Sequence, residues 1–257
     1  MKIKSGMVSV TFRALEPESI IELSAEAGLE GIEWAGDVHV PPGTLERAEE
    51  VGRLTREAGL DVVSYGSYYR VGVSENEGMS FQSVLDTAIA LQAPSIRVWA
   101  GRGSFEGFSE EETQHIVEET KRIAAMAGQA GIDISFEYHR NTLTETAGSA
   151  RRLLDAVSCS NVYIYWQPVY GMPAEENIEG MRVLMSEITN IHVFHWWPTN
   201  QDRHLLQVGA EDWRSYFKEL MGQDGKSRFA MIEFVKDDSM ENFAQDAAIL
   251  RQWLARV

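Results

Sequence analysis

The chain has 257 residues, 44% of them hydrophobic, with a formal net charge of −16 and one cysteine, Cys159. This charge opposes binding to nucleic acid or to an anionic membrane surface. No apolar run reaches the roughly 18 residues that a transmembrane helix needs. A lone cysteine forms no internal disulfide, so we expect a cytoplasmic protein.

Strand-like segments alternate with helix-like segments along the whole chain. The predicted strands are residues 7–12, 31–35, 61–65, 95–100, 133–138, 162–166, 190–195 and 229–235. The predicted helices are residues 17–28, 43–59, 79–92, 109–130, 144–157, 174–187, 211–221 and 239–255. Several helix ends carry local signals, such as Pro17 in the first turn of the first helix and Ser109 before the fourth.

Strict β–α alternation predicts a parallel sheet. Eight such units in a chain of this length are typical of a single α/β domain with the (β/α)₈ barrel fold, which we expect over residues 1–257. An open doubly wound sheet is the alternative. Against it, the first strand runs into TFRALEP and not into a G-x-G-x-x-G motif. The segment GSYYRVG, residues 66–72, is interpreted as a loop over the barrel mouth.

Polar side chains recur on the face of the strands that should line the barrel. In the fifth strand, Ser135 and Glu137 oppose Ile134 and Phe136. Active sites of such barrels lie at the carboxyl ends of the strands. The chemically useful residues near these ends are Glu33, Arg97, Trp99, Glu137, His139, Gln167, His192 and Glu233.

Interior carboxylates are costly unless they are paired or bind a metal ion. Convergence of Glu137, Glu233 and one imidazole would suit a divalent ion such as Mn²⁺, Mg²⁺, Co²⁺ or Zn²⁺. The alternative for Glu137 is an interior ion pair with Arg97. The stretch NIHVFHWWP, residues 190–198, offers two histidines for the imidazole.

His192 has the inward parity and is the candidate ligand, whereas His195 lies on the opposite parity and is expected to orient a neighbour or to contact the substrate. A slip of one residue at the strand end would exchange the two. Five of the seven tryptophans fall near strand ends, which predicts a cavity with aromatic walls: Trp34, Trp99, Trp166, Trp196 and Trp197. Packing in the core or at a subunit interface is the alternative for these rings.

The segments ISFEYH, YIYWQP, NIHVFHW and AMIEFV resemble the xylose isomerase-like TIM-barrel superfamily, which includes sugar-phosphate isomerases and epimerases, ketose 3-epimerases, inosose dehydratase and endonuclease IV. The resemblance extends over the whole chain. In the epimerase branch it implies a metal site formed by Glu137, the position of Gln167, His192 and Glu233. Relatives often form dimers or tetramers, so the resemblance is compatible with a homo-oligomer.

The chain departs from the family pattern at Gln167, where the family has an aspartate before a proline. A glutamine still offers a carbonyl oxygen to a metal, but the site loses one negative charge and should bind the metal more weakly. The family histidine shortly after this position is missing. Arg203 stands near the place of an arginine that holds the substrate in the epimerase branch.

The mechanism that the resemblance implies is proton transfer through an enediolate by paired glutamates, here Glu137 and Glu233, with the metal polarising the carbonyl oxygen. The substrate would be a small sugar or polyol-derived carbonyl compound without a phosphate, because the segment VKDDS after the last strand is acidic. The residues that we expect to contact it are His139, Arg97, Trp99, Trp166, His195 and Arg203.

A metal-assisted isomerase or epimerase is therefore the leading hypothesis. A dehydratase like inosose dehydratase is the nearest alternative, since it needs the same base, metal and carbonyl group. A sugar-binding barrel that has lost its metal is a further alternative. An endonuclease is disfavoured because it needs more metal ligands and a surface that tolerates DNA.

Overall fold

The computed structural model describes residues 3–221 and 227–256, and in it the strands form a closed parallel barrel. The strands are β1 (Ile3–Val8), β2 (Gly31–Ala35), β3 (Asp61–Val71), β4 (Ser95–Ala100), β5 (Asp133–Glu137), β6 (Val162–Trp166), β7 (Ile188–Val193) and β8 (Arg228–Ile232). They pair in chain order, and β1 closes the barrel on β8.

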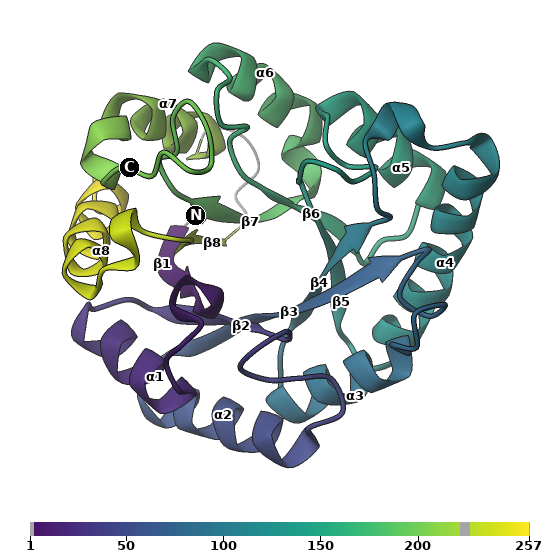
Figure 1. The fold of residues 1–257 in the computed structure, drawn as a ribbon, viewed down its shortest axis with the longest axis horizontal. Helices are drawn as coiled ribbons and strands as arrows, with labels where there is room; N and C mark the ends of the chain where they lie inside the picture. The colour runs from purple at the N-terminus through teal and green to yellow at the C-terminus, as the bar shows by residue number, and fades with distance from the viewer. Residues whose placement is uncertain (1–2, 222–226, 257) are drawn as a thin grey trace.

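Helices surround the barrel on its outside (Figure 1). They are α1 (Pro17–Glu26), α2 (Leu45–Glu57), α3 (Phe81–Leu91), α4 (Glu110–Gln129), α5 (Ala147–Val157), α6 (Ala174–Leu184), α7 (Ala210–Met221) and α8 (Met240–Leu254). Each follows the strand of the same number, which confirms the predicted (β/α)₈ fold. Ser109 caps α4 in a capping box with Glu112, as its position before the helix predicts.

The first predicted strand, 7–12, is wrong in its position. β1 begins at Ile3, and residues Ser9–Phe12 form a 3₁₀ helix, η1. The Ser9 hydroxyl accepts a hydrogen bond from the Ala35 N–H at 2.8 Å, and the Thr11 hydroxyl accepts one from the Phe234 N–H at 3.1 Å. These polar side chains, which look like the inward face of a strand, instead bond to the backbone of neighbouring segments at the barrel mouth.

The third strand is longer than predicted, because residues 66–71 continue β3 and do not form a loop. The pairing of β3 with β4 is interrupted between Gly66 and Arg70, and Tyr68 lies within this irregularity with a φ of 60°. An extended strand with such a bulge can re-aim a side chain, and here it directs Tyr68 towards Trp99, with ring centroids 5.2 Å apart.

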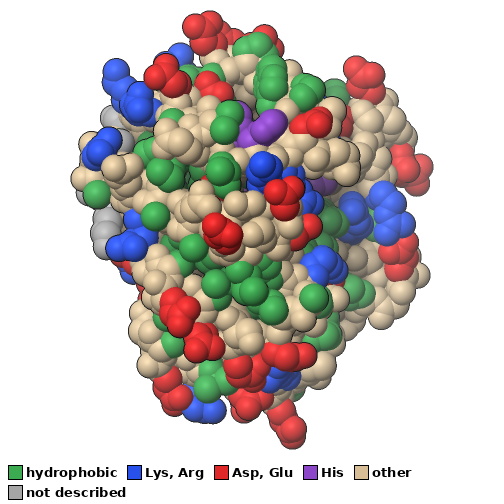
Figure 2. All heavy atoms as spheres, turned by 60° about the vertical axis from the view of Figure 1, so that its left-hand side comes forward, with side chains coloured by type: hydrophobic (Ala, Val, Ile, Leu, Met, Phe, Trp, Pro, Cys, Tyr) green, Lys and Arg blue, Asp and Glu red, His purple; other side chains and the backbone are tan. Residues whose placement is uncertain are grey.

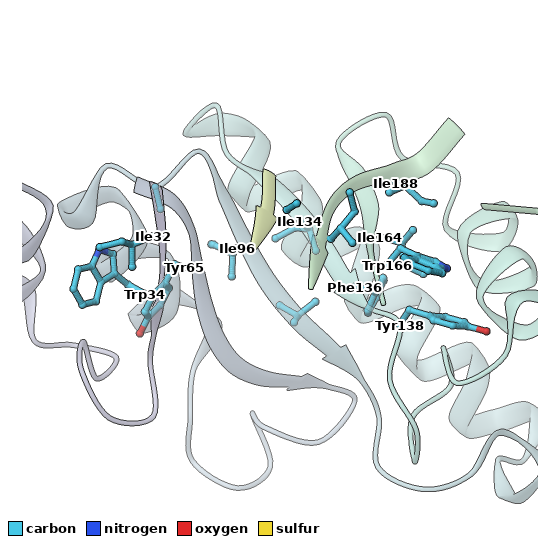
Figure 3. Packing of buried hydrophobic residues seen from close by; sticks show 14 of the residues in the cluster. Ile32, Trp34, Tyr65, Ile96, Ile134, Phe136, Tyr138, Ile164, Trp166 and Ile188 are labelled. Atoms are coloured by element: carbon cyan, nitrogen blue, oxygen red, sulfur yellow. The ribbon is translucent and has the colours of Figure 1, made fainter. Parts of the chain in front are cut away.

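Hydrophobic side chains form one large layer between the strands and the helices. Figure 3 shows part of this layer, with residues of successive strands such as Ile96, Ile134 and Ile164. A smaller cluster fills the barrel interior and consists of Val8, Val10, Ala35, Val63, Tyr165 and Met231. Apolar side chains thus fill part of the interior. Charged side chains such as Glu137 and Glu233 lie at the carboxyl ends of the strands.

The surface carries many acidic side chains. On the face in Figure 2, Lys and Arg side chains lie among Asp and Glu and do not form a continuous basic band. Among the described residues, no helix combines the length and the apolar character needed to cross a membrane.

Candidate active site

Charged side chains meet inside the barrel at the carboxyl ends of the strands. Glu33 lies on β2, Arg97 on β4, Glu137 on β5 and His192 on β7, and Glu233 follows β8 directly. None of these side chains belongs to a residue more than 7% exposed. Alternation along each strand brings these positions to the inward face, at the end where barrel enzymes have their sites.

Three of the four residues expected to hold a metal ion lie around one nitrogen of the fourth, Nδ1 of His192. This atom is 3.0 Å from Gln167 Oε1, 3.6 Å from Glu233 Oε2 and 3.8 Å from Glu137 Oε1. Ligand atoms that lie about 2.0–2.2 Å from a common ion are separated from one another by roughly 3–3.5 Å. The buried Glu137–His192–Glu233 group could therefore bind a metal ion after small side-chain shifts.

The electrostatics of the group also fit a cation. Within the described part of the chain, the Glu233 carboxylate receives no hydrogen bond; burial and the nearby carboxylates of Glu137 and Glu33 raise its pKa, with His192 and Arg97 opposing them. For His192, burial alone would lower the pKa, but the carboxylates of Glu233, Glu33 and Glu137 raise it. A divalent ion bound here would supply positive charge that stabilises the ionised carboxylate of Glu233.

Glu137 has a different environment from Glu233. The Arg97 guanidinium forms a close ion pair with its Oε2 atom, and the Trp99 indole N–H donates to the same oxygen at 2.6 Å. Burial would raise the pKa of Glu137, but Arg97, His139, His192 and the Trp99 N–H together lower it. Glu137 is thus fixed as an anion, with its Oε1 atom directed towards His192.

Arg97 also pairs with Glu33, whose Oε1 atom accepts from the arginine Nε at 2.7 Å. The absence of a side chain at Gly66 makes this arrangement possible, since a Cβ there would lie 2.8 Å from Arg97 Nη2 and 2.9 Å from Glu33 Oε1. Arg97 was expected either to contact the substrate or to form an interior ion pair with Glu137. The structure shows the ion pair. Both of its carboxylate partners orient it inside the barrel.

A cavity of about 360 Å³ opens above these residues. Arg97, Glu137, Gln167 and Glu233 lie at its lining, and its aromatic walls include Tyr68, Trp99, Tyr170 and Trp196. The predicted aromatic-walled cavity therefore exists, with Trp99 and Trp196 among the expected tryptophans. Its size suits a small molecule.

His139 lines the cavity, and its Nε2 atom has no hydrogen-bond partner among the described residues. Its Nδ1 atom lies 2.6 Å from the Arg140 carbonyl oxygen, which can only accept, so Nδ1 carries the proton in a neutral ring. The Nε2 lone pair is then available. The ring also packs against Trp99, with centroids 5.3 Å apart, which holds its orientation.

Two residues expected to contact the substrate lie elsewhere. Trp166 has the outward parity, is 1% exposed and packs against Trp213 and Tyr216 of α7; Figure 3 shows it within the hydrophobic layer. His195 lies past the end of β7 and packs against Gly209, where no room remains for a Cβ. Neither residue lines the cavity above the buried charged residues, so we do not retain them as substrate contacts.

Arginines surround the mouth of the cavity. Arg203 is at the lining as expected, and it also forms a salt bridge with Asp238 at 2.6 Å. Arg13 and Arg140 were not identified from the sequence, because they lie in connecting segments outside any strand pattern. Their positions give the one signal in the sequence that could have pointed to the cavity: Arg13 directly follows η1 and Arg140 directly follows His139.

Comparison with known proteins gives a family and several similar folds. The family model described as "Xylose isomerase-like TIM barrel" matches residues 21–254. A 3-dehydroshikimate dehydratase of Bacillus anthracis is 25% identical over 170 residues, which cover 63% of this chain and 60% of that protein. The chain thus aligns with less than two thirds of this curated relative.

Solved structures share the whole barrel at low identity. A probable 3-DHS dehydratase from Bacillus anthracis has a TM-score of 0.81 at 20% identity, covering 98% of this chain and 99% of that one. A D-allulose 3-epimerase from Methylomonas sp. has a TM-score of 0.72 at 16% identity, covering 98% of each chain. These similarities support the fold, and the family match over most of the sequence shows that the chain belongs to the xylose isomerase-like TIM-barrel family.

Proposed function

We propose that this chain is a metal-assisted dehydratase of a small polyhydroxylated carbonyl compound that bears a carboxylate. The enzyme would remove the proton beside the carbonyl group and pass it to the hydroxyl on the next carbon, which then leaves as water. One C–H and one C–O bond break, and a carbon–carbon double bond forms. The observation that carries the proposal is the unequal environment of Glu137 and Glu233 beside a cavity that also contains His139.

The metal ion would be held by Glu137, Gln167, His192 and Glu233. Three of these residues offer oxygen, which favours a hard ion such as Mn²⁺ or Mg²⁺. When bound, the ion would polarise the carbonyl oxygen of the substrate. Arg97 and Trp99 keep Glu137 ionised and oriented for this task.

His139 is the proposed base, because its Nε2 lone pair is free and its ring lines the cavity. Glu137 is poorly suited to returning a proton, since Arg97 and Trp99 stabilise its anionic form. Epimerisation needs two glutamates that each take up and release a proton. A site in which one glutamate is held as an anion therefore favours loss of water. The name of the curated relative, 3-dehydroshikimate dehydratase, agrees with this order of preference.

Arginine side chains support a negatively charged substrate. Arg140 lines the cavity and bonds to the Tyr170 carbonyl oxygen at 3.2 Å, and it forms no salt bridge with a carboxylate of the described residues. Its guanidinium can hold a carboxylate with two hydrogen bonds. This adds a carboxylate to the expected sugar or polyol-derived carbonyl compound, while the absence of a phosphate stays a prediction.

An epimerase is the second candidate, favoured by the position of Glu137 and Glu233 in one site. The two reactions differ in product. We would incubate the protein and Mn²⁺ with 3-dehydroshikimate and with ketoses that lack a carboxylate, recording ultraviolet absorbance and deuterium uptake from D₂O. A dehydratase forms an absorbing unsaturated product, whereas an epimerase forms a deuterated stereoisomer without that absorbance.

His139→Gln should lower kcat by about 10²–10⁴-fold, the usual contribution of a positioned base, while the Kd for Mn²⁺ stays unchanged because His139 is not a ligand. His115→Gln is the matched control, since His115 is an exposed histidine on α4. A fully active His139→Gln variant would rule out this base, and stereoisomer formation without water loss would replace the dehydratase by the epimerase.

A further inference from the structure

The second ring nitrogen of His192 has an unusual environment. His192 is fully buried, and its Nε2 atom has no hydrogen-bond partner among the described residues. The nearest carboxylate oxygen is Glu33 Oε1, at 3.7 Å. A buried ring nitrogen without a partner is costly, so its surroundings invite an explanation.

The position of the ring proton explains why Nε2 makes no hydrogen bond to Glu33. Nδ1 lies 3.0 Å from Gln167 Oε1, an oxygen that can only accept, so Nδ1 carries the proton in the neutral ring. A metal ion on Nδ1 needs the lone pair of that nitrogen. The proton must then lie on Nε2, where it faces Glu33.

Glu33 is held in place to accept this proton. Its side chain is completely buried; the Ser64 hydroxyl donates to Oε2 at 2.6 Å and Arg97 Nε donates to Oε1 at 2.7 Å. A shift of the His192 ring by less than 1 Å would bring Nε2 into hydrogen-bond range of Oε1, about 2.7–3.2 Å.

We propose that Glu33 is a positioning residue for the metal site: it accepts the Nε2–H of His192 in the metal-bound protein and, through Arg97, also fixes the ligand Glu137. Such outer carboxylates set the tautomer and direction of ligating histidines. The two ion pairs of Arg97, with Glu33 and with Glu137, would thereby help to orient two ligands from β5 and β7. The inference rests on the metal site of the proposed function.

A purely structural role for Glu33, neutralising Arg97, would not require any effect on His192. Two variants separate the possibilities. Glu33→Asp keeps the charge but withdraws the carboxylate by about 1.5 Å, one carbon–carbon bond. Glu33→Gln loses the charge but keeps an acceptor oxygen at the original distance. The matched control is Glu119→Gln, a buried glutamate on α4 whose carboxylate accepts from the Tyr69 hydroxyl and the Gly72 N–H and contacts none of the proposed ligands.

The first measurement is Mn²⁺ affinity by calorimetry on folded, full-length protein. Glu33→Asp should bind Mn²⁺ about 10–100-fold more weakly than wild type, as for other outer-sphere changes, and Glu33→Gln should lose less. Glu119→Gln should stay within about twofold. If Glu33 acted only through its negative charge, Glu33→Gln would weaken Mn²⁺ binding more than Glu33→Asp does. That order of affinities would overturn the proposal, and so would wild-type affinity in Glu33→Asp.

The second measurement needs no variant and can overturn the proposal even if Glu33→Asp does not fold. ¹⁵N NMR of the histidines, recorded with saturating diamagnetic Zn²⁺, should show His192 protonated on Nε2. A proton that stays on Nδ1 contradicts the inference while leaving the metal-assisted function possible. A wild-type protein that binds neither Mn²⁺ nor Zn²⁺ removes both.

Discussion

At the scale of single residues, the two glutamates of the site should respond oppositely to the same substitution. Without metal, Glu233→Gln should leave the free energy of unfolding unchanged or raise it at neutral pH, because the buried Glu233 has a raised pKa and its charged form is disfavoured in the folded state. This gain should vanish below about pH 4, where the carboxyl is protonated in both states.

Glu137→Gln should instead destabilise the protein, by about 1.5–3 kcal/mol, because Arg97 and Trp99 lose a charged hydrogen-bond partner. Urea unfolding of both variants in the presence of a chelator measures the difference. Equal losses for the two variants would show that the environments of the two carboxylates are not distinct. Both variants should lose turnover, whatever their stability.

At the scale of elements, hydrophobic alternation predicted most strands and failed where polar side chains bond to the backbone. Ile3–Val8 contains Lys4, Ser5 and Gly6, which conceal the strand, while Ser9 and Thr11 give η1 the alternation of a strand. The continuation of β3 was missed because Gly66 looks like a turn residue. Its real role, room for the Arg97–Glu33 pair, depends on a neighbouring strand and cannot be predicted from local sequence.

One contact between elements predicts a pH dependence of stability. Asp246 of α8 is 2% exposed and accepts from the Leu206 N–H at 2.8 Å, which ties α8 to the 3₁₀ helix η4 (Leu206–Gly209). Burial raises the pKa of Asp246 to about 6, although the Leu206 N–H opposes this. A raised pKa means that the stability present at low pH is lost as pH rises towards 6.

Asp246→Asn keeps an acceptor oxygen and has no charge to bury. The variant should therefore be more stable than wild type above pH 6, by up to about 3 kcal/mol for a pKa raised from 3.8 to about 6, and similar to it near pH 4. Thermal unfolding between pH 4 and 8 tests this, with Asp155→Asn on the exposed face of α5 as control. A constant difference across that range would exclude titration of Asp246 as its cause.

At the scale of the whole molecule, closure of the barrel is what makes a site predictable from short motifs. Inward parity at the strand ends predicts Glu137, His192 and Glu233 from the sequence, because a closed parallel barrel brings equivalent positions together. Position near a strand end failed for Trp166, because its outward parity places the ring in the hydrophobic layer against α7. The arginines of the mouth were missed because residues outside the strands follow no periodic rule. The connecting segments that determine the substrate are thus the least predictable part of the chain.

The same closure predicts how the metal should affect global stability. The four proposed ligands come from β5, β6, β7 and β8 or their ends, so an ion would link half of the barrel and bind only the folded chain. Mn²⁺ at about 100 times its Kd should then raise the free energy of unfolding by about 2.7 kcal/mol, measured as a shift of the urea midpoint with an unchanged slope.

The net charge of −16 makes a control essential, since an acidic surface also attracts Mn²⁺ without a specific site. Glu233→Gln removes one negative charge from the proposed ligands and leaves the surface intact, so it should lose most of the stabilisation by Mn²⁺. Equal stabilisation of wild type and Glu233→Gln would assign the effect to the surface. Loss of the effect in this variant alone locates the ion among the buried strand ends, because the rest of the molecular charge is the same in both proteins.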